Sequence, residues 1–295
     1  MNIVSKAIKR IQNKGLMETV KLTSNITCGL MDFYLNPFAK KQSKLPHPDN
    51  EKIKSKFESS GLNVISYRIN IPEFQKWVNE ADFPENYKSS YGSIFIEKAL
   101  EHYVGAKLLE LKNTDMLMDI AASSSSWFEM AEKMYGCTAY ALDYTYPKGI
   151  NGKKIGADAT NIPLPDRFAT KMVLHCAYEM FEGDADIRLL PEAQRLLVNG
   201  GKMLILPLYM NNFYFADSSP RAHRVGLDYQ GAERVWRDDG HIVRFSRKYS
   251  VEAFLQRIVN NMGNFKLKIY YIENEKEVSP ECYLKFAAMF EKGDK

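Results

Sequence analysis

The stretch from Met116 to Met210 constrains the fold of this 295-residue chain most strongly. It opens with a short apolar run, Met116–Ile120, followed by six small residues and then a helical pattern over Trp127–Tyr135. A second apolar run comes next and ends at Asp143. This succession predicts a strand, a tight turn, a helix and a second strand, which is the first half of a nucleotide-binding βαβ unit.

The turn of small residues is the part of this unit that would meet a ligand. Small side chains let a ligand come close to the backbone, and the helix that follows offers free N–H groups. Ala121, Ser123 and Ser125 stand where such turns usually carry glycine. Asp143 follows Asp119 by 24 residues, close to the offset expected of a carboxylate that binds a ribose. Taken alone, the pattern also fits an ordinary α/β turn.

The residues after Asp143 continue the alternation of strands and helices. They comprise an extended segment, a loop with two prolines, a strand, an amphipathic helix, a glycine stop and a further strand. The segments are Lys154–Asp158, Ala159–Phe168, Ala169–His175, Ala185–Leu197, Asn199–Gly201 and Lys202–Tyr209.

These features resemble the class I S-adenosylmethionine-dependent methyltransferases, of the type 11-like kind, over about residues 90–210. The shared pattern comprises Asp119, Asp143, the pair Asp158-Ala159 and the triplet Asn199-Gly200-Gly201. The segments EKALEHY, IGADATNIPLPD and LHCAYEMFEGDADI are most similar to bacterial members encoded in surface-polysaccharide gene clusters. The resemblance implies a Rossmann-like α/β fold, a mostly parallel sheet with an antiparallel last strand, and S-adenosylmethionine as cofactor.

The resemblance also implies roles for individual residues. Asp143 would accept hydrogen bonds from the ribose hydroxyls, Asp158 would accept from the adenine amine, and Ala159 would offer its backbone N–H. An acid at a strand end can instead cap the next helix. The full set of predicted cofactor contacts is Asp119, Ala121, Ser123, Asp143, Tyr144, Asp158, Ala159 and His175.

The predicted catalytic residues are His175 and Glu179. His175 ends the fourth strand at the edge where open α/β sheets bind ligands. A histidine near neutral pKa is a natural base for a hydroxyl acceptor, and Glu179 follows four residues later. A strand-end histidine is otherwise often a packed polar residue, and His223 and His241 are alternatives. No metal-ligand spacing occurs, so no metal site is predicted.

The last strands discriminate between nucleotide cofactors. Lys266–Ile272 and Cys282–Phe290 read as strands whose connection is too short for a crossover helix, so they form a hairpin. The final strand therefore runs antiparallel, an arrangement that resembles methyltransferases and argues against a dinucleotide-dependent dehydrogenase.

Three regions surround this pattern. Residues 1–57 carry 11 Lys and Arg against 4 acids, and residues 3–11 have an amphipathic helical pattern. That helix either packs on the protein or gives residues 1–44 a peripheral membrane contact. Residues 58–114 read as a helical cap with Glu97 and Glu101 on one face, more simply solvated than turned inward. Residues 115–295 form the core, with an insertion at 211–262.

The insertion concentrates arginines that suit an anionic or sugar-like acceptor. The alternative is a surface lobe with local ion pairs. The arginines are Arg221, Arg224, Arg234, Arg237, Arg244 and Arg247.

Composition narrows the function. A net charge of +4 is too small to indicate nucleic-acid binding. Four scattered cysteines, no signal-peptide pattern and no long apolar run favour a cytoplasmic protein, or one peripheral at the inner membrane face. We therefore predict a methyltransferase acting on a small polar, sugar-derived acceptor in surface-glycan biosynthesis. The alternative is a scaffold of the same fold that has lost cofactor binding, and the oligomeric state stays open.

Overall fold

The computed structural model describes residues 45–220, 222, 226–237 and 242–293, with 17, 20, 23–24, 27–28, 31 and 40–42 before them. The predicted helix at 3–11 and Arg221, His223, Arg224 and His241 lie outside the described residues. The chain divides into two compact units, which we describe separately. The core unit comprises Pro48–Glu179, Asp184–Asn212 and Tyr249–Lys295. The inserted unit comprises Met180–Gly183 and Phe213–Lys248 with the residues up to His47.

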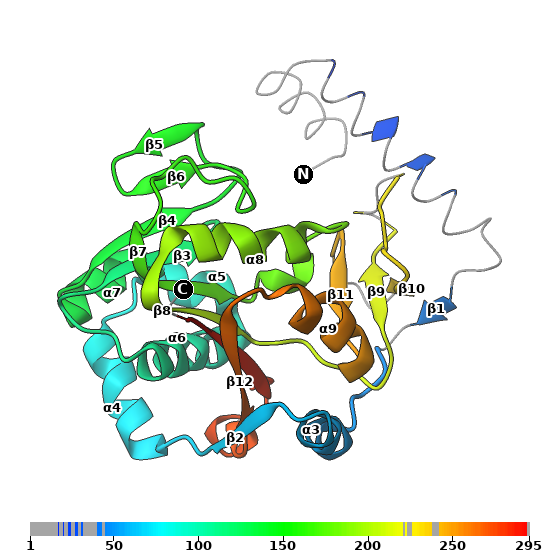
Figure 1. The fold of residues 1–295 in the computed structure, drawn as a ribbon, viewed down its shortest axis with the longest axis horizontal. Helices are drawn as coiled ribbons and strands as arrows, with labels where there is room; N and C mark the ends of the chain where they lie inside the picture. Colours follow the sequence, from blue (N-terminus) through cyan, green and yellow to red (C-terminus); the bar gives the residue numbers. More distant parts are fainter. Residues whose placement is uncertain are drawn as a thin grey trace. The chain divides into compact units, whose positions relative to one another are not determined.

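The core unit is built on a nine-stranded sheet in the order β2-β12-β13-β8-β7-β3-β4-β6-β5 (Figure 1). Strands β3, β4, β6, β7 and β8 are mutually parallel where they pair, and β13 is antiparallel to both of its neighbours. The bounds are β2 Asn63–Tyr67, β3 Met116–Ile120, β4 Thr138–Leu142, β5 Gly149–Asn151, β6 Lys154–Gly156, β7 Ala169–His175, β8 Leu197–Leu206, β12 Phe265–Ile272 and β13 Phe286–Lys292.

This strand order confirms the predicted fold class, a Rossmann-like methyltransferase fold. The chain runs from β3 outward to β4 and β6, then returns to β7 and β8 on the other side of β3. The direction of winding therefore reverses between β3 and β7, which is the position where open α/β sheets bind ligands. The antiparallel β13 lies between β8 and β12, as the predicted hairpin requires.

Several predicted boundaries are wrong. The last strand begins at Phe286 rather than Cys282, because residues 279–285 form a loop after the short helix α10 (Glu275–Val278). Helix α8 (Ala185–Leu196) ends without the Asn-Gly-Gly stop, since β8 follows at Leu197. Gly200, with φ of +70°, instead marks an irregular stretch inside β8. The segment expected to be a helical cap also contributes the edge strand β2.

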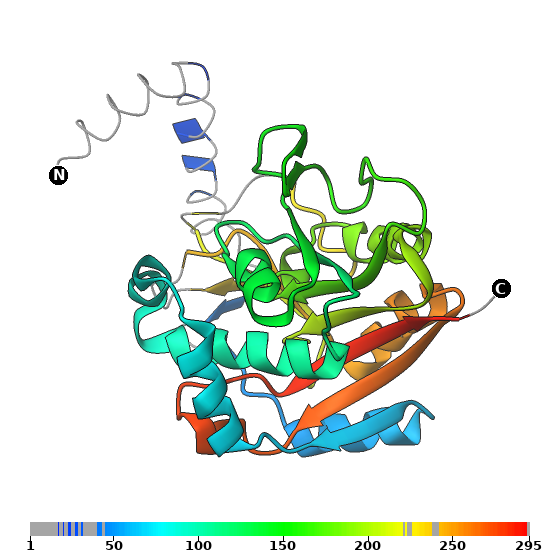
Figure 2. The same ribbon diagram turned by 90° about the vertical axis from the view of Figure 1, so that its left-hand side faces the viewer.

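Helices cover both faces of the sheet. Right-handed crossovers in opposite directions place α7 (Trp127–Tyr135) and α8 on opposite faces (Figures 1 and 2). On the α7 face, α6 (Phe95–Leu109) packs with α4 (Ile71–Ala81) through aromatic rings. The short α5 (Glu85–Tyr91) precedes α6, and α9 (Val251–Arg257) leads to β12. Within the described residues, no helix is long and apolar enough to cross a bilayer.

Helix α3 (Asn50–Ser59) spans the predicted boundary at residue 57. The Phe57 side chain is fully buried, with its ring 5.7 Å from that of Phe254 and 6.0 Å from that of Phe286. Residues from 48 onward therefore belong to the core unit, and a truncation at Phe57 would remove part of its packing.

The inserted unit contains a four-stranded sheet of its own, in the order β1-β10-β9-β11. Its charged residues contact each other. Buried Asp217 accepts from Lys248 at 2.9 Å and lies 3.5 Å from Arg237, while Arg244 pairs with Glu182. Arg237 and Arg244 therefore form local ion pairs within the inserted unit. An acceptor-binding role for the insertion stays a prediction. The bounds are β1 Lys40–Gln42, β9 Phe215–Ser218, β10 Glu233–Arg237 and β11 Ser246–Lys248.

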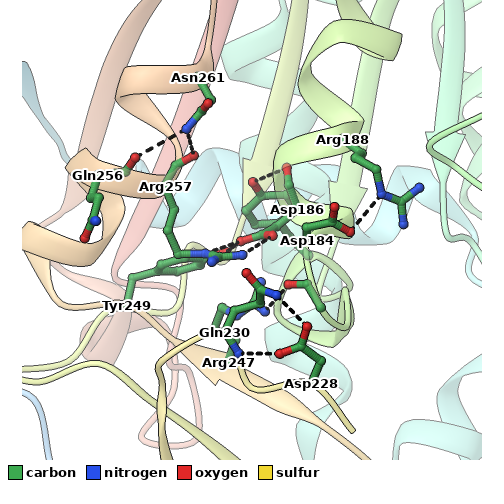
Figure 3. A network of polar contacts seen from close by, with 12 residues as sticks. Asp184, Asp186, Arg188, Asp228, Gln230, Arg247, Tyr249, Gln256, Arg257 and Asn261 are labelled. Atoms are coloured by element: carbon green, nitrogen blue, oxygen red, sulfur yellow. Dashed lines mark hydrogen bonds and ion pairs between the residues drawn. The ribbon is translucent and has the colours of Figure 1, made fainter. Parts of the chain in front are cut away.

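A buried carboxylate joins α8 to α9 in the core unit (Figure 3). Asp186 is fully buried and accepts two hydrogen bonds from Arg257, Nη2 to Oδ1 at 2.7 Å and Nε to Oδ2 at 3.1 Å. The Tyr249 hydroxyl donates to Oδ2 at 2.6 Å. A two-pronged pair with a third donor satisfies the buried charge, whereas loss of one partner would leave it uncompensated.

We expect Arg257→Met to destabilise the protein by about 3–5 kcal/mol, because it leaves the buried Asp186 carboxylate without its cation. Urea unfolding gives the free energy. The matched control is Arg188→Met, since Arg188 pairs with Asp184 at 2.9 Å while both side chains are about half exposed. That change should cost less than about 1 kcal/mol. Equal losses in the two variants would contradict the importance of the buried pair.

Candidate functional site

The candidate site lies at the edge where the parallel strands β3, β4, β6, β7 and β8 end, which we call the carboxyl edge. The turn after β3 enters this edge directly. Ala121 and Ser123 have φ values of +57° and +50°, a left-handed conformation normally used by glycine. Each such residue costs roughly 1–2 kcal/mol. The turn therefore keeps the glycine-type backbone although the glycines are absent.

Asp143 ties this turn to the end of β4. Its Oδ2 accepts from the backbone N–H of Ser123 at 2.9 Å. Its Oδ1 accepts from the N–H of Thr145 at 2.8 Å and from the Thr145 hydroxyl at 2.6 Å. A carboxylate offers about four acceptor positions, so these bonds leave about one. Asp143 is 3% exposed, and its first function in this structure is to hold the turn.

Asp158 repeats this turn at the end of the neighbouring strand β6. Its Oδ1 accepts from the N–H and the hydroxyl of Thr160, at 2.8 and 2.9 Å. Asp143 and Asp158 therefore sit in identical Asp-x-Thr turns at the ends of adjacent strands. Asp158 is exposed and Ala159 beside it is 8% exposed. Each turn fixes one carboxylate oxygen and orients the other.

Two tyrosines follow Asp143 and differ in their surroundings. Tyr144 is 75% exposed, so its ring is accessible beside Asp143. The Tyr146 hydroxyl donates to the backbone carbonyl of Ser123 and supports the same turn. The predicted cofactor residues Ala121, Ser123, Asp143 and Tyr144 thus come together around one turn.

His175 is buried rather than at the open surface. Its side chain is 7% exposed, with Nδ1 3.6 Å from Oδ1 of Asp119. The ring meets those of His102 and Trp127 edge-on, at centroid distances of 4.5 and 5.6 Å. A Cβ added at Gly105 of α6 would lie 2.9 Å from Nε2, so glycine makes room for the imidazole. These surroundings are those of a packed polar residue, and its catalytic role stays a prediction.

Glu179 is 5% exposed. It lies in the 3₁₀ turn η2 (Tyr178–Met180), where its Oε1 accepts from the thiol of Cys176 at 3.6 Å. Cys176 itself adopts a φ of +50° directly after β7. Its sulfur also lies 3.2 Å from the hydroxyl of Tyr209, at the end of β8. The sequence indicated Glu179 but not Cys176 or Tyr209.

Helix α6 contributes charged residues that the sequence placed in solvent, and that expectation is wrong. Glu97 and Glu101 are 0% exposed, and Lys98 is 6% exposed. Lys98 Nζ donates to Glu101 Oε1 at 2.7 Å and to the Tyr283 hydroxyl at 2.8 Å. Glu97 Oε2 accepts from the backbone N–H of Tyr283 at 3.0 Å. The sequence signal for this burial is the absence of a polar face, because apolar residues occur on every side of helix α6.

Several buried polar atoms here lack a hydrogen-bond partner in the part of the chain that the structure describes. Such atoms are rare in native proteins. They are Glu97 Oε1, Glu101 Oε2, His102 Nδ1, Asp119 Oδ2, Trp127 Nε1 and both ring nitrogens of His175.

Burial shifts the pKa values of titratable side chains in this region. It raises the pKa of Asp119, which the His175 contact partly opposes. It lowers the pKa of His102 well below the usual value, and His102 Nε2 and the Tyr87 hydroxyl share a hydrogen bond of 2.6 Å. No group of three or more potential metal ligands occurs among the described residues.

Comparisons with known proteins do not identify a family for this chain. No protein-family profile and no curated protein matches the chain. Among solved structures, it is similar to the 1,6-didemethyltoxoflavin N1-methyltransferase of Burkholderia thailandensis, at 11% identity and a TM-score of 0.46, over 86% of this chain and 93% of that one. It is also similar to PH0226 of Pyrococcus horikoshii, at 15% identity and a TM-score of 0.46, over 72% and 93%. It is similar as well to geranyl diphosphate C-methyltransferase of Streptomyces coelicolor, at 11% identity and a TM-score of 0.43, over 84% of this chain and 100% of that one. These similarities are too low to support an argument, and the fold assignment depends on the strand order.

Glycine should relieve the strained turn. We expect Ala121→Gly and Ser123→Gly to leave the free energy of unfolding unchanged or to raise it by up to about 1 kcal/mol. The control is Ala131→Gly, inside α7 and fully buried, which should lose about 1 kcal/mol. Urea unfolding compares the three variants. A loss at Ala121 and Ser123 equal to that at Ala131 would refute the left-handed turn.

Cys176 should be chemically inert. Burial raises its pKa to about 12, so the thiol stays protonated and is a poor nucleophile. We expect iodoacetamide at mildly alkaline pH to alkylate the exposed Cys28 and to leave Cys176 unmodified. Peptide mass spectrometry reads both sites in one sample. Labelling of Cys176 at the rate of Cys28 would show that the thiol is ionised.

Proposed function

We propose that this protein is an S-adenosylmethionine-dependent methyltransferase that acts on a small polar acceptor. The observation that carries the proposal is the pair of identical Asp-x-Thr turns at the ends of β4 and β6, next to the left-handed turn after β3. These three features lie at the carboxyl ends of β3, β4 and β6, and β3 borders the position where the winding of the sheet reverses, which is the ligand position of open α/β folds.

The residues present fit an adenosine group. The remaining acceptor position of Asp143 suits a ribose hydroxyl, and the outer oxygen of Asp158 suits the amine of adenine. The backbone N–H of Ala159 and the exposed ring of Tyr144 would hold the base. A hydrogen bond to a carboxylate is directional, so the bond from the ribose hydroxyl and the bond from the adenine amine together would fix the orientation of the nucleoside.

When bound, the cofactor supplies an activated methyl group, and the chain must align the acceptor and remove a proton from it. Asp119, His175 and Glu179 are the proposed residues for these steps. The carboxylate of Asp119 lies 3.6 Å from the imidazole of His175 and can fix its orientation. Glu179 is 5% exposed at the end of β7, a position from which a carboxylate can accept a proton.

The biological role belongs to the same proposal. The segments EKALEHY, IGADATNIPLPD and LHCAYEMFEGDADI support a sugar-derived acceptor in bacterial surface-glycan synthesis. The excess of Lys and Arg in residues 1–57 supports a peripheral membrane contact through residues 1–44.

We expect Asp158→Ala to lower the affinity for S-adenosylmethionine at least about tenfold, because it removes a charge-assisted bond to the ligand. Asp158 is exposed, so thermal stability should hardly change. The control is Asp166→Ala, another exposed acid at the opposite end of β7, which should bind as the wild type does. Calorimetric titration measures all three proteins.

Two outcomes would oppose this proposal. Unchanged affinity in Asp158→Ala would remove Asp158 from the site. No binding of S-adenosylmethionine by the wild-type protein would favour the second candidate, a non-catalytic scaffold of the same fold. The absent glycines at Ala121 and Ser123 are the observation that favours that candidate.

A further inference from the structure

A cavity of about 810 Å³ lies at the edge of the sheet opposite the carboxyl edge. Its lining comes from the loop before β7, the last turns of α8, the start of β8, the residue before β12 and the end of β13. Because β7 and β8 begin at this edge and β13 is antiparallel to β8, these segments meet there. The cavity shares no residue with the candidate cofactor site, and its volume is within the range of small-molecule pockets.

The Arg195 guanidinium holds one wall of this cavity together. Its Nη1 donates to the carbonyl of Leu164 at 2.7 Å and to Oδ1 of Asp166 at 2.9 Å. Its Nη2 donates to the carbonyl of Ile162 at 2.9 Å and to Oε1 of Glu192 at 2.8 Å, while Nε donates to Oε2 of Glu192 at 2.9 Å. These bonds use all five N–H donors of the guanidinium. Arg195 is therefore structural, and its charge is shared by the two carboxylates of this wall.

Arg167 is the cation of the lining that a ligand can reach. Its exposed guanidinium makes no hydrogen bond or ion pair within the described part of the chain, whereas Lys292 donates to the carbonyls of Gln194 and Leu197. The φ of Arg167 is +57°, a left-handed conformation that is costly for any residue except glycine. The backbone N–H donates to the carbonyl of Arg195 at 2.9 Å and fixes that conformation. A guanidinium held on a strained backbone at a cavity is suited to bind an oxyanion.

Amide side chains supply neutral polar groups to the same lining. Asn199 is exposed, and its side chain makes no hydrogen bond to any residue that the structure describes. Gln194 and Asn264 donate through Nε2 and Nδ2 to the carbonyls of Met262 and Gly293. Their amide oxygens stay able to accept from a ligand. Amides bind hydroxyl groups, so the lining combines a site for an oxyanion with sites for hydroxyls.

We propose that this cavity binds a hydroxyl-rich organic anion. Arg167 pairs with its phosphate or carboxylate group, and the amides of Asn199, Gln194 and Asn264 bind its hydroxyls. Sugar phosphates and sugar acids have this chemistry, whereas inorganic phosphate would leave most of the cavity unfilled. The inference goes beyond the proposed methyltransferase function and does not depend on it, because the two sites lie at opposite edges of the sheet.

The experiment is calorimetric titration of the full-length protein with glucose 6-phosphate, gluconate, glucose and inorganic phosphate, at matched ionic strength. The first two probes differ in their anionic group, glucose lacks that group, and inorganic phosphate lacks the hydroxylated body. We expect at least one sugar anion to bind about tenfold or more tightly than glucose, through its charge-assisted bond to Arg167, and more tightly than inorganic phosphate. The tighter of the two identifies the anionic group. Saturation with S-adenosylhomocysteine should leave this affinity unchanged.

Variants locate the effect. Arg167→Gln should lower the affinity for the sugar anion to that for glucose. Arg167→Gly removes the same guanidinium while relieving the left-handed backbone, so misfolding would not explain a loss of binding in both variants. The control is Arg68→Gln, which removes the same charge from an exposed arginine that pairs with Glu277 at 2.8 Å.

Four outcomes would overturn the inference. They are the absence of binding by both sugar anions, equal or tighter binding of glucose or inorganic phosphate, unchanged affinity in the two Arg167 variants, and displacement of the sugar anion by S-adenosylhomocysteine. Binding of S-adenosylhomocysteine by itself tests the proposed function, so the two failures are distinguishable.

Discussion

The hydrogen bond from the backbone N–H of Ser123 to Asp143 is the constraint on which the candidate site depends. It fixes the turn after β3 to the end of β4 while Ala121 and Ser123 hold left-handed backbone conformations. The sheet holds the ends of β3 and β4 in register, because the two strands pair in parallel along β3 from Met116 to Ile120. This bond offsets part of the free-energy cost of the left-handed conformation, which glycine would adopt at lower cost than alanine or serine.

A second layer of the site comes from α6, which places charge in the interior. Fixing Lys98 and Glu101 there requires the bond to Tyr283, and therefore the loop that precedes β13. The loop before the antiparallel strand β13 thus positions Tyr283 against Lys98 of α6. The fold therefore determines the surroundings of the buried charges, because the loop between the paired strands β12 and β13 also brings Tyr283 into contact with Lys98 of α6.

The sequence predicted the mostly parallel sheet, its antiparallel last strand and the acids at the strand ends, because periodicity and local turn chemistry determine these features. It did not predict the burial of Glu97 and Glu101, since their surroundings include residues nearly two hundred positions later. Nor could it show that His175 turns toward Gly105, because that contact exists only after α6 packs on the sheet. Local pattern therefore predicted the acids at the strand ends, whereas tertiary packing determined the burial of Glu97, Glu101 and His175.

The most direct test of the account is calorimetric titration of the wild-type protein with S-adenosylmethionine, S-adenosylhomocysteine and NAD in parallel. The turn geometry and the two Asp-x-Thr turns predict saturable binding of both adenosyl compounds at one site, with no heat of binding for NAD. Binding of NAD, or the absence of binding by all three, would contradict the assignment of this edge of the sheet as an S-adenosylmethionine site.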